Sequence, residues 1–181
     1  ADRGVLTGKG LDYGGSLART EATGYGLAYY TNEMLKANQL SFPGQRVAIS
    51  GAGNVAIYAI QKVTELGGKV ITCSDSNGYV IDENGIDFKI VKQIKEVERG
   101  RIKDYADRVA SATYHEGAVW DAQVAYDIAL PCATQNEISG DQAKNLIANG
   151  VKVVAEGANM PSSPEAIAAY QAANLLYGPA K

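Results

Sequence analysis

The chain has 181 residues, and 17 Lys and Arg against 20 Asp and Glu give a formal net charge of −3. This length favours one domain that buries a core without disulfide or metal support. No apolar run approaches the ~20 residues that cross a membrane, and no basic block favours nucleic acid as a partner. With only two cysteines and no signal-peptide pattern, a disulfide-rich scaffold is excluded and a cytoplasmic protein is expected.

Residues 1–44 are expected to precede the main folding unit. Residues 1–19 hold five glycines at no regular spacing, so we interpret them as an irregular lead-in. Apolar residues at helical spacing then predict a helix over 20–36 that packs on the domain. The chain starts at Ala1 without methionine and stops soon after an apolar segment, so we expect a piece of a longer protein.

Residues 45–181 alternate between strand and helix patterns. Apolar, β-branched runs predict buried strands at 46–50, 69–75, 126–130, 151–155 and 175–177. A helix follows the first strand and is closed by Gly67-Gly68. This alternation predicts an α/β fold with a doubly wound, mostly parallel, Rossmann-like sheet, in which 45–181 form one dinucleotide-binding domain.

The remaining elements carry their own signals. A polar helix is predicted over 87–98, and two further helices begin after Ser139 and Ser163, which suit N-caps. Turn residues on either side of 79–81 predict a small hairpin. Residues 100–125 show no clear pattern.

A glycine-rich turn, GAGNVA, joins the first predicted strand to its helix. Gly51 permits the tight turn, and Gly53 has no side chain, so a pyrophosphate can approach the backbone. The N–H groups that open the helix, around Asn54 and Val55, and the helix dipole would stabilise that anion. The alternative is a strand–helix turn that happens to contain two glycines, but the strand–helix–strand context favours a dinucleotide fingerprint.

Asp75 follows the fingerprint at the end of the next predicted strand. A carboxylate there accepts the ribose 2′-OH of NAD, whereas a 2′-phosphate calls for cations. Ser76 can donate to a phosphate, and Lys95, Arg99 and Arg101 could fold back toward it. The simpler interpretation of these cations is a solvent-exposed helix face.

Other polar groups follow predicted strands or open a helix. Cys132, Ala133 and Thr134 come directly after one strand and Asn159 after the next, where doubly wound folds bind ligands. Thr23 lies near a helix start, where ordinary N-capping is an equal alternative. The only histidine, His115, is expected at the surface, Cys73 in the core, and no cluster has metal-ligand spacing.

Together these segments resemble the cofactor-binding domain of hexameric glutamate dehydrogenases, within the wider family that includes leucine, phenylalanine and valine dehydrogenases. The resemblance covers essentially the whole chain and is carried by five stretches: YGGSLARTEATGYG, GAGNVA, CSDSNG, ALPCATQNE and VAEGANMP. It implies a parent homohexamer that interconverts L-glutamate with 2-oxoglutarate and ammonia by hydride transfer to a nicotinamide.

The resemblance also implies roles for single residues. Thr23 would hold the nicotinamide carboxamide, Asn54 would contact the cofactor near the pyrophosphate, and Thr134 and Asn159 would line the nicotinamide side. Asp75 and Ser76 would face the adenosine ribose. Lys95 and Arg101 match cations that face the 2′-phosphate, so we expect NADP in preference to NAD, which Asp75 keeps possible.

The resemblance implies that the catalytic lysine and aspartate belong to an N-terminal domain, and that further helices follow Lys181. This chain alone is therefore expected to bind a dinucleotide without turnover. Two alternatives remain open at this point: a catalytically silent dinucleotide-binding regulatory module, and the same domain of another amino-acid dehydrogenase.

Overall fold

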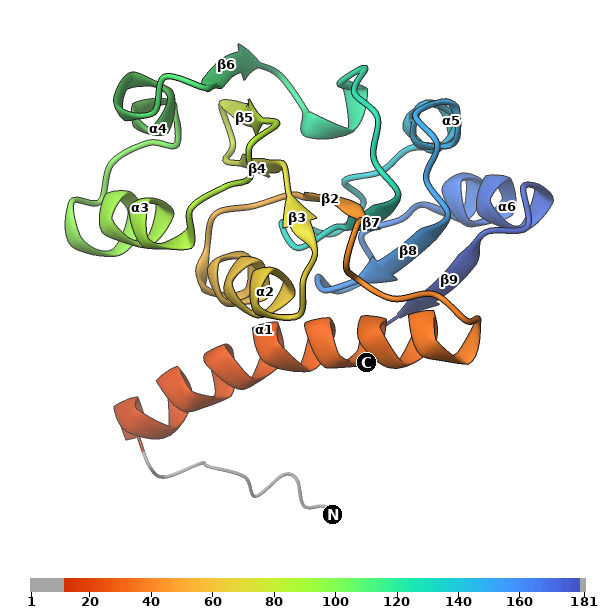
Figure 1. Ribbon diagram of the computed structural model, residues 1–181, viewed down its shortest axis with the longest axis horizontal. Helices are drawn as coiled ribbons and strands as arrows, with labels where there is room; N and C mark the ends of the chain where they lie inside the picture. Colours follow the sequence, from red (N-terminus) through yellow and green to blue (C-terminus); the bar gives the residue numbers. More distant parts are fainter. Residues whose placement is uncertain (1–11, 180–181) are drawn as a thin grey trace.

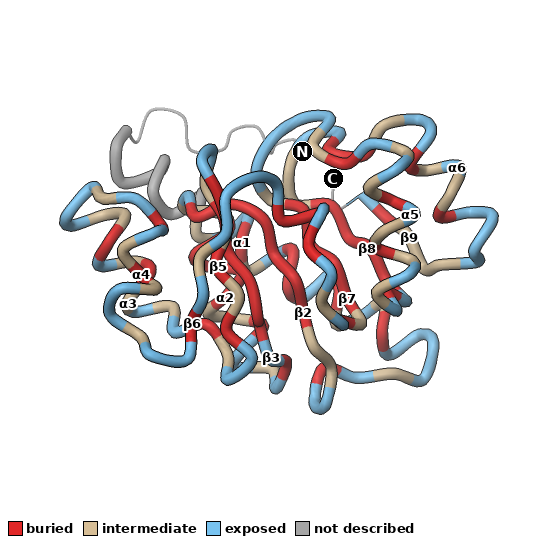
Figure 2. The backbone as a smooth tube through the Cα atoms, turned by 90° about the horizontal axis from the view of Figure 1, so that it is seen from above, coloured by how far each residue is buried: buried red, intermediate tan, exposed pale blue. Residues whose placement is uncertain are grey.

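A five-stranded parallel sheet forms the centre of the computed structural model, which describes the backbone of residues 12–179 and the side chains of residues 21–179. The strand order is β3-β2-β7-β8-β9. The three central strands are almost wholly buried (Figure 2), which fits a parallel sheet covered on both faces. The strand bounds are β2 (Arg46–Ile49), β3 (Lys69–Val70), β7 (Ile128–Leu130), β8 (Val153–Glu156) and β9 (Leu176–Pro179). The α/β, doubly wound prediction is confirmed.

Helices cover both faces of this sheet (Figure 1). Helices α1 (Asp12–Ala37) and α2 (Asn54–Glu65) share one core with Val47 and Ile49 of β2. Helices α5 (Gly140–Ala148) and α6 (Pro164–Ala172) share the other core with Ala48. Side chains of one strand alternate between the faces, so β2, β7 and β8 contribute to both cores.

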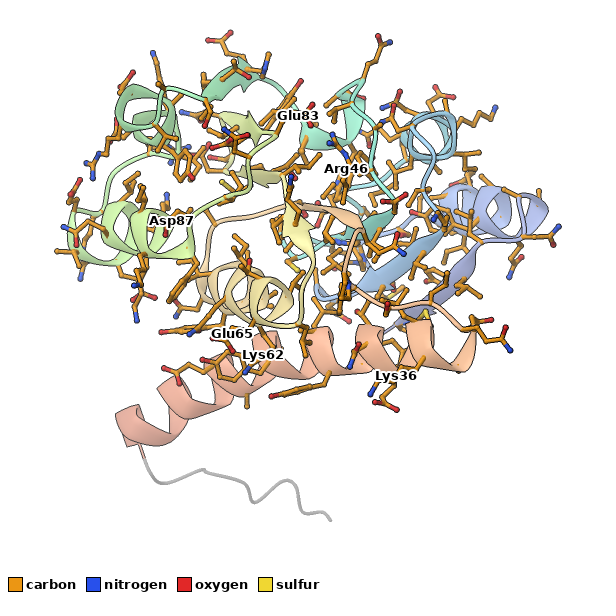
Figure 3. The ribbon with its side chains drawn as sticks, in the orientation of Figure 1. Lys36, Arg46, Lys62, Glu65, Glu83 and Asp87 are labelled. Atoms are coloured by element: carbon orange, nitrogen blue, oxygen red, sulfur yellow. The ribbon has the colours of Figure 1, made fainter. Side chains whose placement is uncertain are left out.

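The predicted strand 69–75 is confirmed as extended chain but not as one strand, because the chain changes sheets within it and forms β3 and then β4. Ile71 N donates to Val47 O in the parallel sheet (2.9 Å), but Ile71 O accepts from Asp82 N in a second sheet (2.8 Å). That antiparallel sheet contains the predicted hairpin, and its strands are β4 (Thr72–Ser74), β5 (Gly78–Asp82) and β6 (Ala112–Glu116). An ion pair between Arg46 and Glu83 ties the two sheets together (Figure 3).

Short elements fill the rest of the chain. The predicted helix at 87–98 is confirmed as α3 (Phe88–Lys92), which runs into a π-helical turn, η2 (Gln93–Val97). Residues 100–125 form α4 (Lys103–Arg108), β6 and the 3₁₀ turn η3 (Val119–Asp121). The two serine N-caps are also confirmed: Ser139 makes a capping box with Gln142, and Ser163 accepts from the N–H of Ala166.

Helix α1 begins earlier than predicted. The irregular lead-in is wrong for residues 12–19, which are helical, while residues 1–11 lie outside the described part of the chain. Glycine lowers helix propensity by only about 1 kcal/mol per residue, so a local signal of this kind is weak. Within the described residues no helix, α1 included, has both the length and the apolarity that crossing a bilayer requires.

Helices α1 and α2 pack closely along their length. Lys62 of α2 lies 4.9 Å from the centre of the Tyr25 ring and 5.5 Å from that of Tyr29 (Figure 3). At Gly24 a Cβ would lie 2.8 Å from the Val55 carbonyl oxygen, whereas at Gly26 nothing lies within 4 Å. The close crossing at residue 24 therefore depends on the absence of a side chain.

The two glycines give a matched pair of variants. Gly24→Ala forces α1 away from α2, and we expect it to lose about 1–3 kcal/mol of stability. Gly26→Ala enters open space in the same helix, and we expect it to gain up to about 1 kcal/mol. Urea unfolding measures both. Equal effects of the two substitutions would contradict the close crossing.

Candidate functional site

The turn after β2 opens helix α2 toward an unfilled corner. Gly51 has a backbone φ of +93°, which glycine adopts without strain. Gly53 is the N-cap residue of α2 and no side chain caps the helix. Nothing lies within 4 Å of the place that a Cβ on Gly53 would occupy. The helix therefore presents its N-terminal N–H groups and the positive end of its dipole to an open space.

This corner belongs to a cleft of about 690 Å³ at the carboxyl ends of the strands. Strand β2 pairs with β3 on one side and with β7 on the other, so the cleft lies at the switch point where doubly wound sheets bind ligands. Loops after four different strands line it. The lining residues are 51–53, 74–76, Lys95, 117–120, 132–134 and Glu137.

Two buried serines fix the glycine-rich turn to its neighbours. Gly51 N donates to Ser74 Oγ at 2.8 Å, and Cys132 N donates to Ser50 Oγ at 2.9 Å. A Cβ on Gly51 would lie 3.2 Å from the Cys132 carbonyl oxygen. The three loops after β2, β4 and β7 are therefore held together before any ligand arrives.

The loops after β7 and β8 form one rim, which confirms their predicted proximity. Pro131 O accepts from Gly157 N at 2.9 Å and from Ala158 N at 3.0 Å. A Cβ on Gly157 would lie 2.8 Å from Cys132 Sγ, so the loops touch through a glycine. Asn159 is exposed on this rim but does not line the cleft, and neither do Thr23 and Val55.

Asp75 lines the cleft, but its carboxylate is already engaged. Oδ1 accepts from Asn77 N (2.9 Å) and Gly78 N (3.2 Å), and Oδ2 accepts from Ile102 N (2.9 Å). Burial alone would raise the pKa of Asp75, but these amides and the nearby Arg101 outweigh it and lower the pKa. Asp75 therefore ties its own turn to residue 102, and most of its acceptor capacity is used within the protein.

The downstream cations fold back toward Ser76. Arg101 Nη2 donates to Ser76 Oγ at 2.9 Å and lies 3.3 Å from Asp75 Oδ1. Lys95 Nζ donates to Gly100 O at 3.0 Å and also lines the cleft. The interpretation as an ordinary solvent-exposed helix face is therefore wrong for Lys95 and Arg101. Arg101 and Asn54 do not line that cleft but border a second, polar one of about 610 Å³, which Lys95 and Arg99 border too.

Several cleft residues were not predicted from the sequence. Gly117, Val119 and Trp120 come from the segment 100–125, which shows no pattern, and Ser74 reads as an ordinary strand residue. Glu137 accepts hydrogen bonds from the Trp120 ring and from two loop amides. Its place at the end of the ALPCATQNE stretch was the one signal available.

The thiols and the histidine take no part in a metal or nucleophile site. Burial raises the pKa of both thiols, so Cys73 and Cys132 stay protonated near neutral pH. His115 is exposed on β6, stacked at 5.1 Å on the Tyr79 ring. In the part of the chain that the structure describes, no group of three or more His, Cys, Asp or Glu is placed to hold a metal ion.

Fold and cleft together define a class: a Rossmann-like α/β domain with a dinucleotide fingerprint at the switch point of its sheet. Residues 14–181 match the sequence profile described as Glutamate/Leucine/Phenylalanine/Valine dehydrogenase. The chain belongs to this family.

Within this family, the chain is similar to several glutamate dehydrogenases. The chain is 51% identical over 182 residues to an NAD(P)-specific glutamate dehydrogenase of Xylanibacter ruminicola, covering 99% of this chain and 40% of the relative. It is 53% identical over 180 residues to an NADP-specific glutamate dehydrogenase of Haemophilus influenzae, covering 98% and 40%. The chain thus spans about 40% of the length of the curated relatives that it matches.

Solved structures agree with these relatives. The crystal structure of Plasmodium falciparum glutamate dehydrogenase matches with a TM-score of 0.84 and 44% identity, over 89% of this chain and 35% of that one. A second glutamate dehydrogenase of the same organism matches with a TM-score of 0.84 and 38% identity, over 90% and 36%.

The engagement of Asp75 predicts a pH-dependent stability. A carboxylate with a lowered pKa stabilises the fold fully above the ordinary aspartate pKa of about 3.9, and this contribution is lost as the pH falls through the folded-state value. Asp75→Asn keeps the shape of the side chain, but its NH₂ group then faces a backbone N–H that donates to the carboxylate in the unmodified protein. We expect the variant to be less stable by about 1–3 kcal/mol near neutral pH, with the difference closing in acid. Urea unfolding across pH measures this, and a constant difference would contradict the assignment.

Proposed function

We propose that this chain is the NADP-binding part of an enzyme that interconverts L-glutamate with 2-oxoglutarate and ammonia. One observation carries the proposal: the uncapped start of α2 opens on the same cleft as Lys95 and Ser76, and the Ser76 hydroxyl accepts from Arg101. That arrangement suits a diphosphate at the helix and a further phosphate at the cations. The glutamate dehydrogenases among its relatives, several of them named NADP-specific, support the choice.

The residues of this chain would bind and orient the dinucleotide. Gly51, Gly53, Asn54 and Val55 would hold the diphosphate through the turn and the start of α2. Ser76, Lys95 and Arg101 would bind the 2′-phosphate, with Asp75 holding Arg101 in place. The rim after β7 and β8 (Cys132, Ala133, Thr134 and Asn159) and Thr23 of α1 would border the nicotinamide.

The dinucleotide, when bound, supplies the chemistry by exchanging hydride at nicotinamide C4. The chain would fix which face of the nicotinamide ring is open to the substrate and how far the ring lies from it. It would also exclude water from that end of the cleft. The lysine and aspartate that act on the amino acid would come from outside residues 1–181, so these residues alone would bind without turnover. We also propose that the whole protein is a hexamer in the cytoplasm.

An activity assay separates the alternatives. The protein that carries this sequence should oxidise NADPH when given 2-oxoglutarate and ammonia. Activity with the oxo acids of leucine, phenylalanine or valine instead would identify another member of the family. Binding of NADPH without turnover of any of these substrates would favour a silent regulatory module.

Substitution at the open corner tests the diphosphate site. Gly53→Val places a branched side chain where the diphosphate must approach. The unliganded protein has room for that side chain. We therefore expect binding of both NADPH and NADH to be lost, while the free energy of unfolding changes by no more than about 1 kcal/mol. Titration of nicotinamide fluorescence measures the binding. Unaltered affinity would contradict the fingerprint assignment.

The 2′-phosphate site has its own test. Lys95→Ala/Arg101→Ala removes two cations beside Ser76, so we expect NADPH affinity to fall at least about tenfold, which is a loss of about 1.4 kcal/mol or more, with little change for NADH. Added salt should weaken NADPH binding to the unmodified protein more than to this variant. Lys92→Ala/Arg108→Ala changes the net charge equally, at cations that pair with Tyr58 and Glu98. If both double variants behave alike, net charge and not a phosphate site sets the preference.

A further inference from the structure

Glu137 joins two walls of the cleft that are far apart in the chain. Its Oε1 accepts from Trp120 Nε1 at 2.7 Å, on the wall formed by η3. Its Oε2 accepts from Ala133 N at 2.9 Å and from Thr134 N at 3.0 Å, on the rim after β7. All four residues line the cleft. One carboxylate thus accepts from three donors in two separate segments.

The two walls differ in how firmly they are otherwise held. On the η3 side, Asn145 Nδ2 of α5 donates to Trp120 O and to Ala122 O, both at 2.9 Å, and Trp120 itself is buried. On the rim side the flanks are held, since Cys132 N donates to Ser50 Oγ and Asn136 N donates to Met160 O. Ala133 and Thr134 between them are exposed, and the N–H groups of both donate to Glu137. The η3 wall is therefore an anchored base, and Glu137 fixes the exposed loop to it.

We propose that Glu137 is a positioning residue that holds Ala133 and Thr134 in the conformation that receives the nicotinamide half of the dinucleotide. This rests on the proposed function, since it concerns the same cleft. Without the carboxylate, the exposed loop would have to be ordered when the ligand binds, and that cost would lower the affinity. Stability would fall by no more than about 1–3 kcal/mol, because water can reach the two released loop N–H groups and only the buried Trp120 ring N–H loses its partner away from water.

A carboxylate suits this position better than an amide. A glutamine offers one acceptor oxygen, and its NH₂ group would face either the Trp120 N–H or the two loop amides. Glu137→Gln therefore keeps the size of the side chain and breaks one of the two connections. Glu137→Asp keeps the charge, but its shorter side chain cannot reach both walls. Both variants test the connection itself.

The ligands are chosen to separate the two halves of the site. NADPH has both halves, whereas 2′,5′-ADP carries the adenosine and its 2′-phosphate without a nicotinamide. We expect both variants to weaken NADPH binding roughly tenfold, equivalent to about 1.4 kcal/mol, and to leave 2′,5′-ADP binding unchanged. Glu116→Gln removes an equal charge from an exposed residue next to the same wall and serves as the control.

The single tryptophan adds a spectroscopic signature. Trp120 is the only tryptophan in the sequence, so its emission reports on the hydrogen bond to Glu137. We expect Glu137→Gln to shift that emission in the unliganded protein, and Glu116→Gln to leave it unchanged. Trp120→Phe removes the ring N–H but spares both loop amides, so it should weaken NADPH binding less than Glu137→Gln does.

The outcomes distinguish the two proposals. If the unmodified protein binds neither NADPH nor 2′,5′-ADP, the proposed function fails. If it binds both, and Glu137→Gln and Glu137→Asp retain its NADPH affinity, the positioning role is overturned while the proposed function stands. Equal weakening of NADPH and 2′,5′-ADP would also overturn it, because it would indicate a general loss of structure.

Discussion

Everything in this site depends on the close approach of three backbone segments at the carboxyl end of β2. The turn at Gly51 lies against the Cys132 carbonyl and donates to Ser74 Oγ. A side chain on Gly51 would push the loop after β7 away and strain the turn itself. Because that approach is fixed, α2 begins at a set place and points its positive end into the cleft.

The charges around Asp75 explain how an acidic residue and the proposed 2′-phosphate site can share one loop. At the end of the second strand of such a fold, a free carboxylate would bind a ribose hydroxyl and repel a 2′-phosphate. In this chain three backbone amides donate to the carboxylate of Asp75, and Arg101 Nη2 contacts both that carboxylate and Ser76 Oγ. The carboxylate thereby holds Arg101 beside Ser76, so that a positive group and not a free negative one lies next to that hydroxyl.

Local sequence patterns predict those features of the structure that depend on neighbouring residues in the chain. Serine caps, the fingerprint turn and the buried strands follow from spacing and backbone preference, and the structure contains them. The break at Ile71 does not, because both halves of 69–75 have the same β-branched character and only their partners differ. The hydrogen bonds of the Asp75 carboxylate could not be predicted from the sequence either, since its third partner is the amide of residue 102, in a stretch without periodicity.

Helix α1 shows why even the residues outside the cleft belong to the site. At Gly24 it touches the first turn of α2 through Val55, and at Leu27 it meets Gly157 of the rim. The parts of the site proposed for the diphosphate and for the nicotinamide thus both contact α1, within a single turn of that helix. Thr23 immediately precedes the first of these contacts, so its position is set by the same packing that sets the two ends. A substitution that moves α1 would therefore change both halves of the site together, whereas Glu137 contacts only the rim after β7 and the η3 wall.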